Sequence, residues 1–133
     1  MDFTNNRDAS AAELYDIAAK ALENAYAPFS GFRVGSALLD ADGRIFTGVN
    51  IENSSFGATI CAERTAFVKA LSEGSREFTA IAIAAENEEA LPCGICRQFM
   101  YEFSPDILVI TGKDRETLAA RRLSELLPLG FRL

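Results

Sequence analysis

Histidine is absent from this sequence of 133 residues. Its absence excludes Ser-His-Asp and Cys-His nucleophilic sites, metal centres with imidazole ligands, and imidazole general bases. Any acid–base chemistry in this protein must therefore use carboxylates, lysine, tyrosine or cysteine.

Cysteine is scarce and long apolar runs are missing. Three cysteines cannot all pair as disulfides, and a reducing compartment keeps thiols available for metal. No apolar run approaches the roughly 20 residues that span a bilayer. The polar start Met1-Asp2-Phe3-Thr4-Asn5 lacks the features of a signal peptide. These absences predict a cytoplasmic protein with no membrane partner.

An excess of positive charge is missing as well. The chain has 13 Lys and Arg against 19 Asp and Glu, a formal net charge of −6. It therefore carries no electrostatic footprint for DNA, RNA or an anionic membrane, and a small-molecule substrate is favoured over nucleic acid. With 49% hydrophobic and 24% charged residues, the sequence predicts a packed domain, and residues 1–133 are expected to form one domain.

Apolar spacing and turn residues predict alternating helices and strands. Ser10-Ala11-Ala12-Glu13 matches a capping box, and the helical spacing after it predicts a first helix from about Ser10 to Ala25. Asp42-Gly43 predicts the turn of an antiparallel hairpin. The other expected elements are strands at 36–39 and 45–49, a helix beginning near Cys61 and ending at Gly74, a strand at 78–85, a helix at 92–103 and a strand at 107–110.

Residues 117–127 fit two interpretations. They suit either a helix or a strand followed by a short helix starting at Ser124. In either case, the order of elements predicts an α/β sandwich with helices on the faces of the sheet.

All three cysteines lie in two short segments, Cys61-Ala62-Glu63 and Pro92-Cys93-Gly94-Ile95-Cys96. Three thiolates and a carboxylate that is not needed as a ligand are the layout of a zinc deaminase site. Cys61 and Cys93 lie at or next to predicted helix starts, where the helix dipole favours thiolate over thiol. Zinc suits thiolate ligands, and three protein ligands leave a fourth position open for water.

Two charged residues beside Cys61 have expected roles. Glu63 would carry a proton from metal-activated water to the leaving amine. Three thiolates around one dication form a negative cluster, which opposes ionisation of that water. Arg64 lies on the same helix face as Cys61 and would donate hydrogen bonds to the sulfurs, offsetting this charge.

Other interpretations of these residues stay open. Cys93-Gly94-Ile95-Cys96 taken alone equally fits a dithiol oxidoreductase, although Cys61-Ala62-Glu63 favours metal. A structural zinc with Glu63 as fourth ligand, in a zinc-binding interaction protein, is a further alternative. Without their neighbours, Glu63 and Arg64 would be ordinary surface residues of a helix.

Longer motifs resemble the short, homotetrameric class of cytidine deaminases, from Ala27 to Phe131. In chain order they are Pro28-Phe29-Ser30-Gly31-Phe32-Arg33-Val34-Gly35, Gly43-Arg44-Ile45-Phe46, Asn50-Ile51-Glu52-Asn53, Cys61-Ala62-Glu63-Arg64-Thr65, Pro92-Cys93-Gly94-Ile95-Cys96-Arg97-Gln98 and Glu125-Leu126-Leu127-Pro128. The resemblance implies a three-layer α/β/α sandwich with a five-stranded mixed sheet. It further implies zinc-dependent hydrolytic deamination of cytidine and 2′-deoxycytidine in pyrimidine salvage.

The resemblance also implies residue roles. It places zinc on Cys61, Cys93 and Cys96, proton transfer on Glu63, the ribose 3′-hydroxyl on Asn50 and Glu52, and the pyrimidine ring against Phe32. Backbone N–H groups at Cys61 and Ala62 would face the base, and Phe131 would come from a neighbouring subunit of a homotetramer with shared active sites. By default, Phe32 and Phe131 would instead be core or interface aromatics.

Two details bear on the substrate. Where this family commonly has Tyr, six residues after Asn50, the chain has Phe56, so a hydroxyl that could join a polar network between subunits is missing. A deaminase of a cytosine-containing antibiotic shares the zinc motifs and is the nearest alternative. Asn50-Ile51-Glu52-Asn53 favours the nucleoside, because this tetrapeptide is the one that resembles nucleoside handling.

Overall fold

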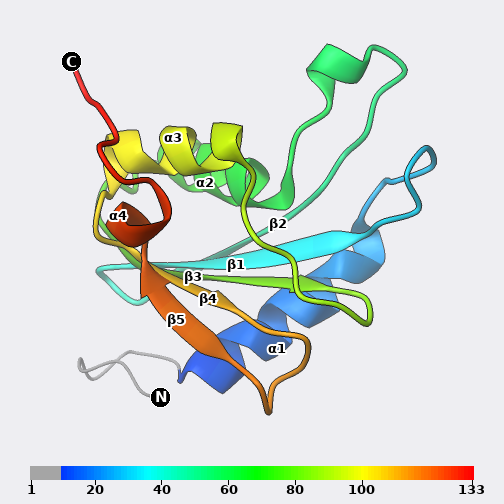
Figure 1. The fold of residues 1–133 in the computed structure, drawn as a ribbon, viewed down its shortest axis with the longest axis horizontal. Helices are drawn as coiled ribbons and strands as arrows, with labels where there is room; N and C mark the ends of the chain where they lie inside the picture. The colour runs from blue at the N-terminus through cyan, green and yellow to red at the C-terminus, as the bar shows by residue number, and fades with distance from the viewer. Residues whose placement is uncertain (1–9) are drawn as a thin grey trace.

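The computed structural model describes residues 10–133 (Figure 1), so the predicted lack of a signal peptide at Met1–Asn5 lies outside the described residues. The elements in chain order are α1 (Ala11–Ala21), the 3₁₀ turn η1 (Leu22–Asn24), β1 (Val34–Asp40), β2 (Ile45–Val49), the 3₁₀ turn η2 (Phe56–Ala58), α2 (Ala62–Ser72), β3 (Phe78–Ala85), α3 (Gly94–Phe103), β4 (Leu108–Thr111), β5 (Ala119–Arg122) and α4 (Leu123–Leu126).

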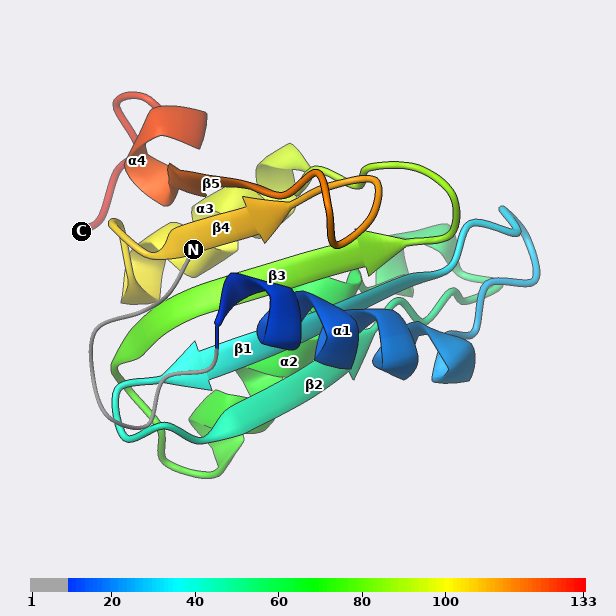
Figure 2. The same ribbon diagram turned by 90° about the horizontal axis from the view of Figure 1, so that it is seen from below.

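The strands form one mixed sheet in the order β2-β1-β3-β4-β5. β3 and β4 run parallel, and the other neighbouring pairs are antiparallel. Helix α1 covers one face of the sheet, and α2 and α3 cover the other (Figures 1 and 2). The predicted three-layer sandwich with a five-stranded mixed sheet is therefore confirmed.

Each face of the sheet has its own apolar core. Ile81 and Ile83 of β3 pack toward α2 and α3, whereas Ala80, Ala82 and Ala84 of the same strand pack toward α1. A strand alternates its side chains between faces, so a strand covered on both sides must be apolar throughout. This explains the continuous apolar run at 78–85. Within residues 10–133, no helix has the length and apolar character needed to cross a bilayer.

Local signals placed most helix ends correctly. The capping box is present, with Glu13 N donating to Ser10 Oγ at 3.1 Å and Ser10 N donating to Glu13 Oε1 at 3.2 Å. The α-helix ends at Ala21 and tightens into η1, so its last predicted turn is 3₁₀ rather than α. Gly74, with φ of +94°, follows the end of α2 as predicted. The second of the two interpretations of 117–127 is correct, because β5 runs directly into α4.

Close packing sets α2 against the sheet. Gly48 of β2 lies so near this helix that a Cβ there would be 2.4 Å from Ala62 O and from Ala66 N. Ser36 of β1 is fully buried, and its Oγ donates to Ala62 O at 2.8 Å. The first turn of α2 is therefore held on β1 and β2, which places the residues around Cys61 relative to the strand ends.

Candidate active site

The three cysteines converge at two helix starts. Cys61 is the N-cap of α2, Cys93 is the N-cap of α3, and Cys96 lies buried in the first turn of α3. Their sulfur atoms all lie within 4.8 Å of one another, and Cys61 Sγ is 3.9 Å from Cys93 Sγ. Tetrahedral zinc with bonds of about 2.3 Å requires sulfurs about 3.8 Å apart. The three thiols therefore fit a zinc ion that keeps one open position.

The charges of the cluster also fit a cation. The pKa of Cys61 is lowered to about 5, first because Cys96 donates to its thiolate and also because Arg64 does. The pKa of Cys96 is raised, first by this bond to Cys61 and then by burial. Three thiols this close cannot all ionise by themselves, and a dication is what would allow it.

Arg64 lies next to the Cys61 sulfur. Its Nη2 is 3.7 Å from Cys61 Sγ. Its Nε is buried and has no hydrogen-bond partner among the residues that the structure describes, so the guanidinium keeps an unused donor beside the cluster. A buried cationic donor at this place partly offsets the negative charge of thiolate ligands.

Glu63 lies in the first turn of α2 with 4% of its surface exposed. Burial raises the pKa of its carboxyl to about 7, and the nearby charge of Cys61 contributes in the same direction. The backbone of the preceding Ala62 is anchored through Ser36. The carboxylate is thus buried in a fixed helical turn next to the thiol cluster.

A cavity of about 380 Å³ opens in front of these residues. Seven of the residues singled out from the sequence line it, namely Phe32, Asn50, Glu52, Cys61, Ala62, Glu63 and Cys93. A larger hollow of about 730 Å³ lies between α1, β2 and α2 and is lined by none of the cysteines. The thiol cluster and the buried carboxylate therefore belong to the smaller cavity.

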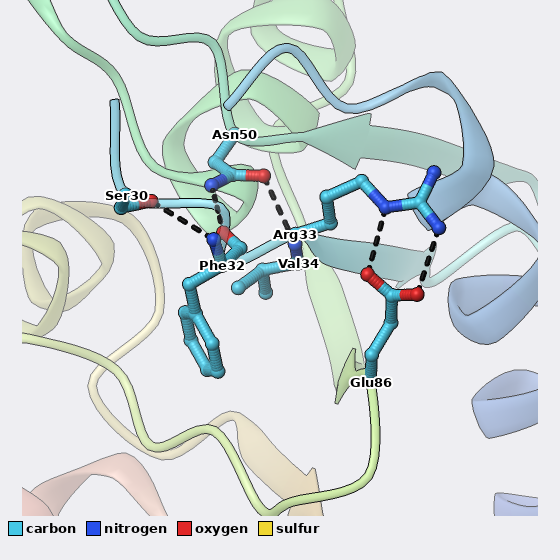
Figure 3. Close-up of polar contacts among 6 residues, drawn as sticks. All are labelled: Ser30, Phe32, Arg33, Val34, Asn50 and Glu86. Carbon is cyan, nitrogen blue, oxygen red and sulfur yellow. Dashed lines mark hydrogen bonds and ion pairs between the residues drawn. The ribbon is translucent and has the colours of Figure 1, made fainter. Parts of the chain in front are cut away.

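Asn50 holds the backbone on both sides of Arg33 (Figure 3), and Glu52 holds Phe29 and Ser30 just before Phe32. Asn50 Oδ1 accepts from Val34 N at 2.9 Å, and Asn50 Nδ2 donates to Phe32 O at 2.8 Å. Glu52 accepts from Phe29 N at 2.8 Å, from Ser30 N at 3.1 Å and from the Ser30 hydroxyl. The hydroxyl bond from Ser30 is the main cause that lowers the pKa of Glu52. Both side chains therefore shape one wall of the cavity.

A second wall of the cavity was not found from the sequence. Glu89, Ala90 and Leu91 line it, although the sequence predicted neither an element nor a site residue between the strand at 78–85 and the helix at 92–103. Glu89 is held there because its Oε2 accepts from Thr111 Oγ1 at 2.6 Å. The position of this stretch in the sequence could have indicated its role. A segment that ends directly before Pro92-Cys93 has to pass close to the cysteines.

Phe131 is the one predicted binding residue that the chain does not bring to this cavity. Its side chain is 63% exposed, and its backbone oxygen accepts from Gln98 Nε2 of α3 at 3.0 Å. Phe131 is not among the residues that line the cavity. The C-terminal segment therefore lies on the outer side of the helix that carries Cys96.

Comparison with known proteins agrees with this geometry. The family model described as "Cytidine and deoxycytidylate deaminase zinc-binding region" matches residues 9–111. A cytidine deaminase of Halalkalibacterium halodurans is 49% identical over 116 residues, which cover 86% of this chain and 88% of that protein. A probable cytidine deaminase of Dictyostelium discoideum is 50% identical over 104 residues, 77% of this chain and 71% of that protein.

Solved structures show the same fold. A cytidine deaminase from Burkholderia pseudomallei superposes with a TM-score of 0.85 at 43% identity, covering 90% of this chain and 97% of that one. The cytidine deaminase of Mycobacterium tuberculosis gives 0.82 at 36% identity, covering 95% and 100%. With the zinc-binding region matched over most of the chain and three thiols placed to hold the metal, this chain belongs to the zinc-dependent cytidine deaminase family.

Proposed function

We propose that the cavity between Phe32 and Glu63 is where this chain deaminates cytidine and 2′-deoxycytidine by hydrolysis. The observation that carries the proposal is the convergence of three thiols and one buried carboxylate on a cavity of about 380 Å³. This volume lies within the roughly 300–1,000 Å³ of small-molecule sites. A dithiol oxidoreductase would need neither the third thiol nor the buried carboxylate, and a closed structural zinc site would need no adjoining cavity.

The three thiolates of Cys61, Cys93 and Cys96 would hold zinc, which supplies Lewis acidity and lowers the pKa of water at its open position. Glu63 removes a proton from the attacking water and delivers it to N3 of the base as the C4–O bond forms. Glu63 then passes the proton of the new C4 hydroxyl to the exocyclic nitrogen. The C4–N bond breaks, and ammonia and uridine are the products.

Phe32 and Glu89 both line the cavity, and Phe32 is proposed to pack against the pyrimidine ring. Asn50 and Glu52 are proposed to bind the ribose 3′-hydroxyl in addition to holding the wall. Three hydrogen bonds already reach the Glu52 carboxylate, which can accept about four, and Asn50 Nδ2 carries a second N–H. The backbone N–H groups of Cys61 and Ala62 are proposed to face the base, because both residues line the cavity.

The charges of the cavity favour an uncharged nucleoside over its 5′-phosphate. Glu52, Glu63 and Glu89 line the cavity, and within residues 10–133 no lysine or arginine does so. A phosphate would meet carboxylates without a cationic partner, which opposes its binding. Of the two substrate types named in the description of the family model, the nucleoside is therefore the proposed one.

The direct test follows the loss of ultraviolet absorbance when purified protein is mixed with cytidine, 2′-deoxycytidine, cytidine 5′-monophosphate or free cytosine. We expect turnover of both nucleosides and little of the other two compounds. Preferred turnover of the monophosphate would contradict the nucleoside assignment. Preferred turnover of a cytosine-containing antibiotic would support the alternative substrate. A Cys93–Cys96 disulfide that cycles with turnover would support the redox interpretation.

Assembly is proposed to complete the site. The C-terminal Leu129, Phe131 and Leu133 are exposed, as are Phe29 and Phe56, whose rings make an edge contact at 5.7 Å between centroids. Exposed apolar groups in this number are typical of surfaces that another chain covers. We propose a homotetramer in which Phe131 covers the base in a neighbouring subunit, and a cytoplasmic role in pyrimidine salvage.

A mixing experiment tests the shared site. Chains with Glu63→Gln and an intact C-terminus are assembled with chains that keep Glu63 and lack residues 130–133. Recovery of activity in mixed assemblies, absent in either parent, requires Phe131 to act on a different chain. If mass measurements confirm mixed assembly and activity does not recover, the shared site is refuted. An unchanged kcat/KM after deletion of 130–133 would place Phe131 outside the site altogether.

A further inference from the structure

An ion pair joins the two walls of the cavity. Arg33 lies between Phe32 and Val34, both of which line the cavity. Glu86 directly follows β3 and precedes the Glu89–Leu91 wall. Arg33 Nε donates to Glu86 Oε1 at 2.7 Å, and Arg33 Nη2 donates to Glu86 Oε2 at 2.8 Å (Figure 3). Such a bidentate pair fixes orientation as well as distance.

The pair lies one step beyond the end of a strand ladder. Val34 of β1 pairs with Ala85 of β3 in the antiparallel register, so Arg33 and Glu86 are the next residues outward on each strand. Side chains alternate along a strand, and Val34 faces the cavity, so Arg33 is directed away from it. In Figure 3 the Phe32 ring and the Arg33 guanidinium lie on different sides of the segment. Any effect of Arg33 on the cavity must therefore pass through the backbone.

The two segments diverge immediately after the pair. Asn87 has φ of +60°, which turns the chain out of the strand direction and toward Glu89, Ala90 and Leu91. On the other side, Asn50 ties Phe32 and Val34 together within their own wall. Within the described part of the chain, the Arg33–Glu86 pair is the one side-chain hydrogen-bonded link between residues 29–33 and residues 86–92.

We propose that Arg33 and Glu86 are positioning residues, a brace that sets the distance between the Phe32 wall and the Glu89–Leu91 wall and thereby the fit of the base. The inference rests on the proposed contact between Phe32 and the base. Neither residue of the brace touches substrate. The second wall also leads into Cys93, so the brace fixes Phe32 relative to the metal side of the cavity.

The expected effect is limited by the exposure of the pair. The side chains of Arg33 and Glu86 are 38% and 43% exposed, and solvent screens such pairs. Removing the brace cannot weaken substrate binding by more than the interaction free energy of the Arg33–Glu86 ion pair. For an exposed pair this corresponds to about a twofold to fivefold rise in KM. The effect on kcat should be smaller, because Glu63 and the cysteines are anchored independently through α2 and α3.

The test compares Arg33→Gln, Glu86→Gln and the double variant in steady-state kinetics with cytidine. We expect each single variant to raise KM by about twofold to fivefold, and the double variant to match the singles because one interaction is lost in all three. The exchanged pair Arg33→Glu with Glu86→Arg should recover much of the loss. High salt should raise the KM of the unchanged protein toward the KM of the variants. It should hardly alter the KM of the variants themselves, because they lack the ion pair.

Arg115→Gln is the matched control. Arg115 and Asp16 form a comparably exposed pair, with Arg115 Nε 3.1 Å from Asp16 Oδ1, and neither residue lines the cavity. This variant should leave KM unchanged, while its thermal stability should change about as much as that of Arg33→Gln. Any one of three results would overturn the proposed brace. They are an equal rise in KM in the control, an unchanged KM in Arg33→Gln, and selective loss of zinc from Arg33→Gln.

Phe32→Ala separates the two levels of the inference. If KM rises in Phe32→Ala and not in Arg33→Gln, the brace fails and the proposed contact with the base stands. If KM is unchanged in Phe32→Ala, the proposed contact itself fails, and the brace as proposed fails with it. A rise in both variants, with kcat changed by less than KM, is the result that the brace predicts.

Discussion

Replacing Gly48 by alanine should lower both stability and activity, although Gly48 does not line the cavity. The added Cβ would lie 2.4 Å from both Ala62 O and Ala66 N and 3.0 Å from Ala66 Cα. These are backbone atoms, which cannot rotate out of the way as a side chain can. To restore an ordinary contact of at least 3.4 Å, α2 must move away from β2 by about 1 Å.

The size of the effect follows from this displacement. Overpacking of this kind costs about 1–3 kcal/mol, which in a chain of this length lowers Tm by about 4–12 °C. Because α2 begins at Ala62, between Cys61 and Glu63, the same shift moves the carboxylate relative to the cysteines of α3. A misplacement of about 1 Å can lower kcat/KM by on the order of 10²-fold.

The assay combines thermal denaturation followed by circular dichroism, zinc content, and kcat/KM for cytidine. Gly57→Ala is the control, because a Cβ at Gly57 would have no atom within 4 Å in residues 10–133 other than those of its two chain neighbours. We expect Gly57→Ala to resemble the unchanged protein in all three measurements. Equal Tm and equal kcat/KM for Gly48→Ala and Gly57→Ala would show that the close approach of α2 to β2 does not hold the site.

Three further predictions concern the site itself. Glu63→Gln should keep its zinc and its fold and lose about 10²- to 10⁴-fold in kcat/KM, and loss of zinc would instead mark Glu63 as a ligand. The protein should contain one zinc per chain, and Cys61, Cys93 and Cys96 should react fully with a thiol reagent only after chelation or unfolding; full activity of metal-free protein would contradict this. Glu52→Gln should lower kcat/KM for cytidine and for 2′-deoxycytidine by similar factors, because an amide accepts a hydrogen bond from a sugar hydroxyl less well than a carboxylate does; an unchanged kcat/KM would remove Glu52 from the site.

Local sequence patterns were sufficient for most of the architecture. The capping box of Ser10 and Glu13, the Asp42-Gly43 turn and Gly74 act through hydrogen bonds and φ angles within a few residues, so they can be recognised without knowledge of the fold. The apolar run at 78–85 indicated a strand covered on both faces, because the side chains of a strand alternate between the two faces of its sheet. Cys61-Ala62-Glu63 and the later cysteine pair indicated zinc, because metal chemistry demands ligand types that few other sites require.

Interactions between distant segments were decided by the tertiary structure alone. Residues 117–127 carry no local signal that separates helix from strand, and β5 forms because β4 offers it an edge with which to pair. The wall at Glu89–Leu91 and the link between Arg33 and Glu86 depend on the register of β1 with β3, which brings residues 53 positions apart into contact. Phe131 lies outside the cavity of its own chain because Gln98 and the end of α4 lead the C-terminal segment over α3. A sequence pattern names the residue types that a reaction needs, whereas strand pairing and helix packing determine which of them meet.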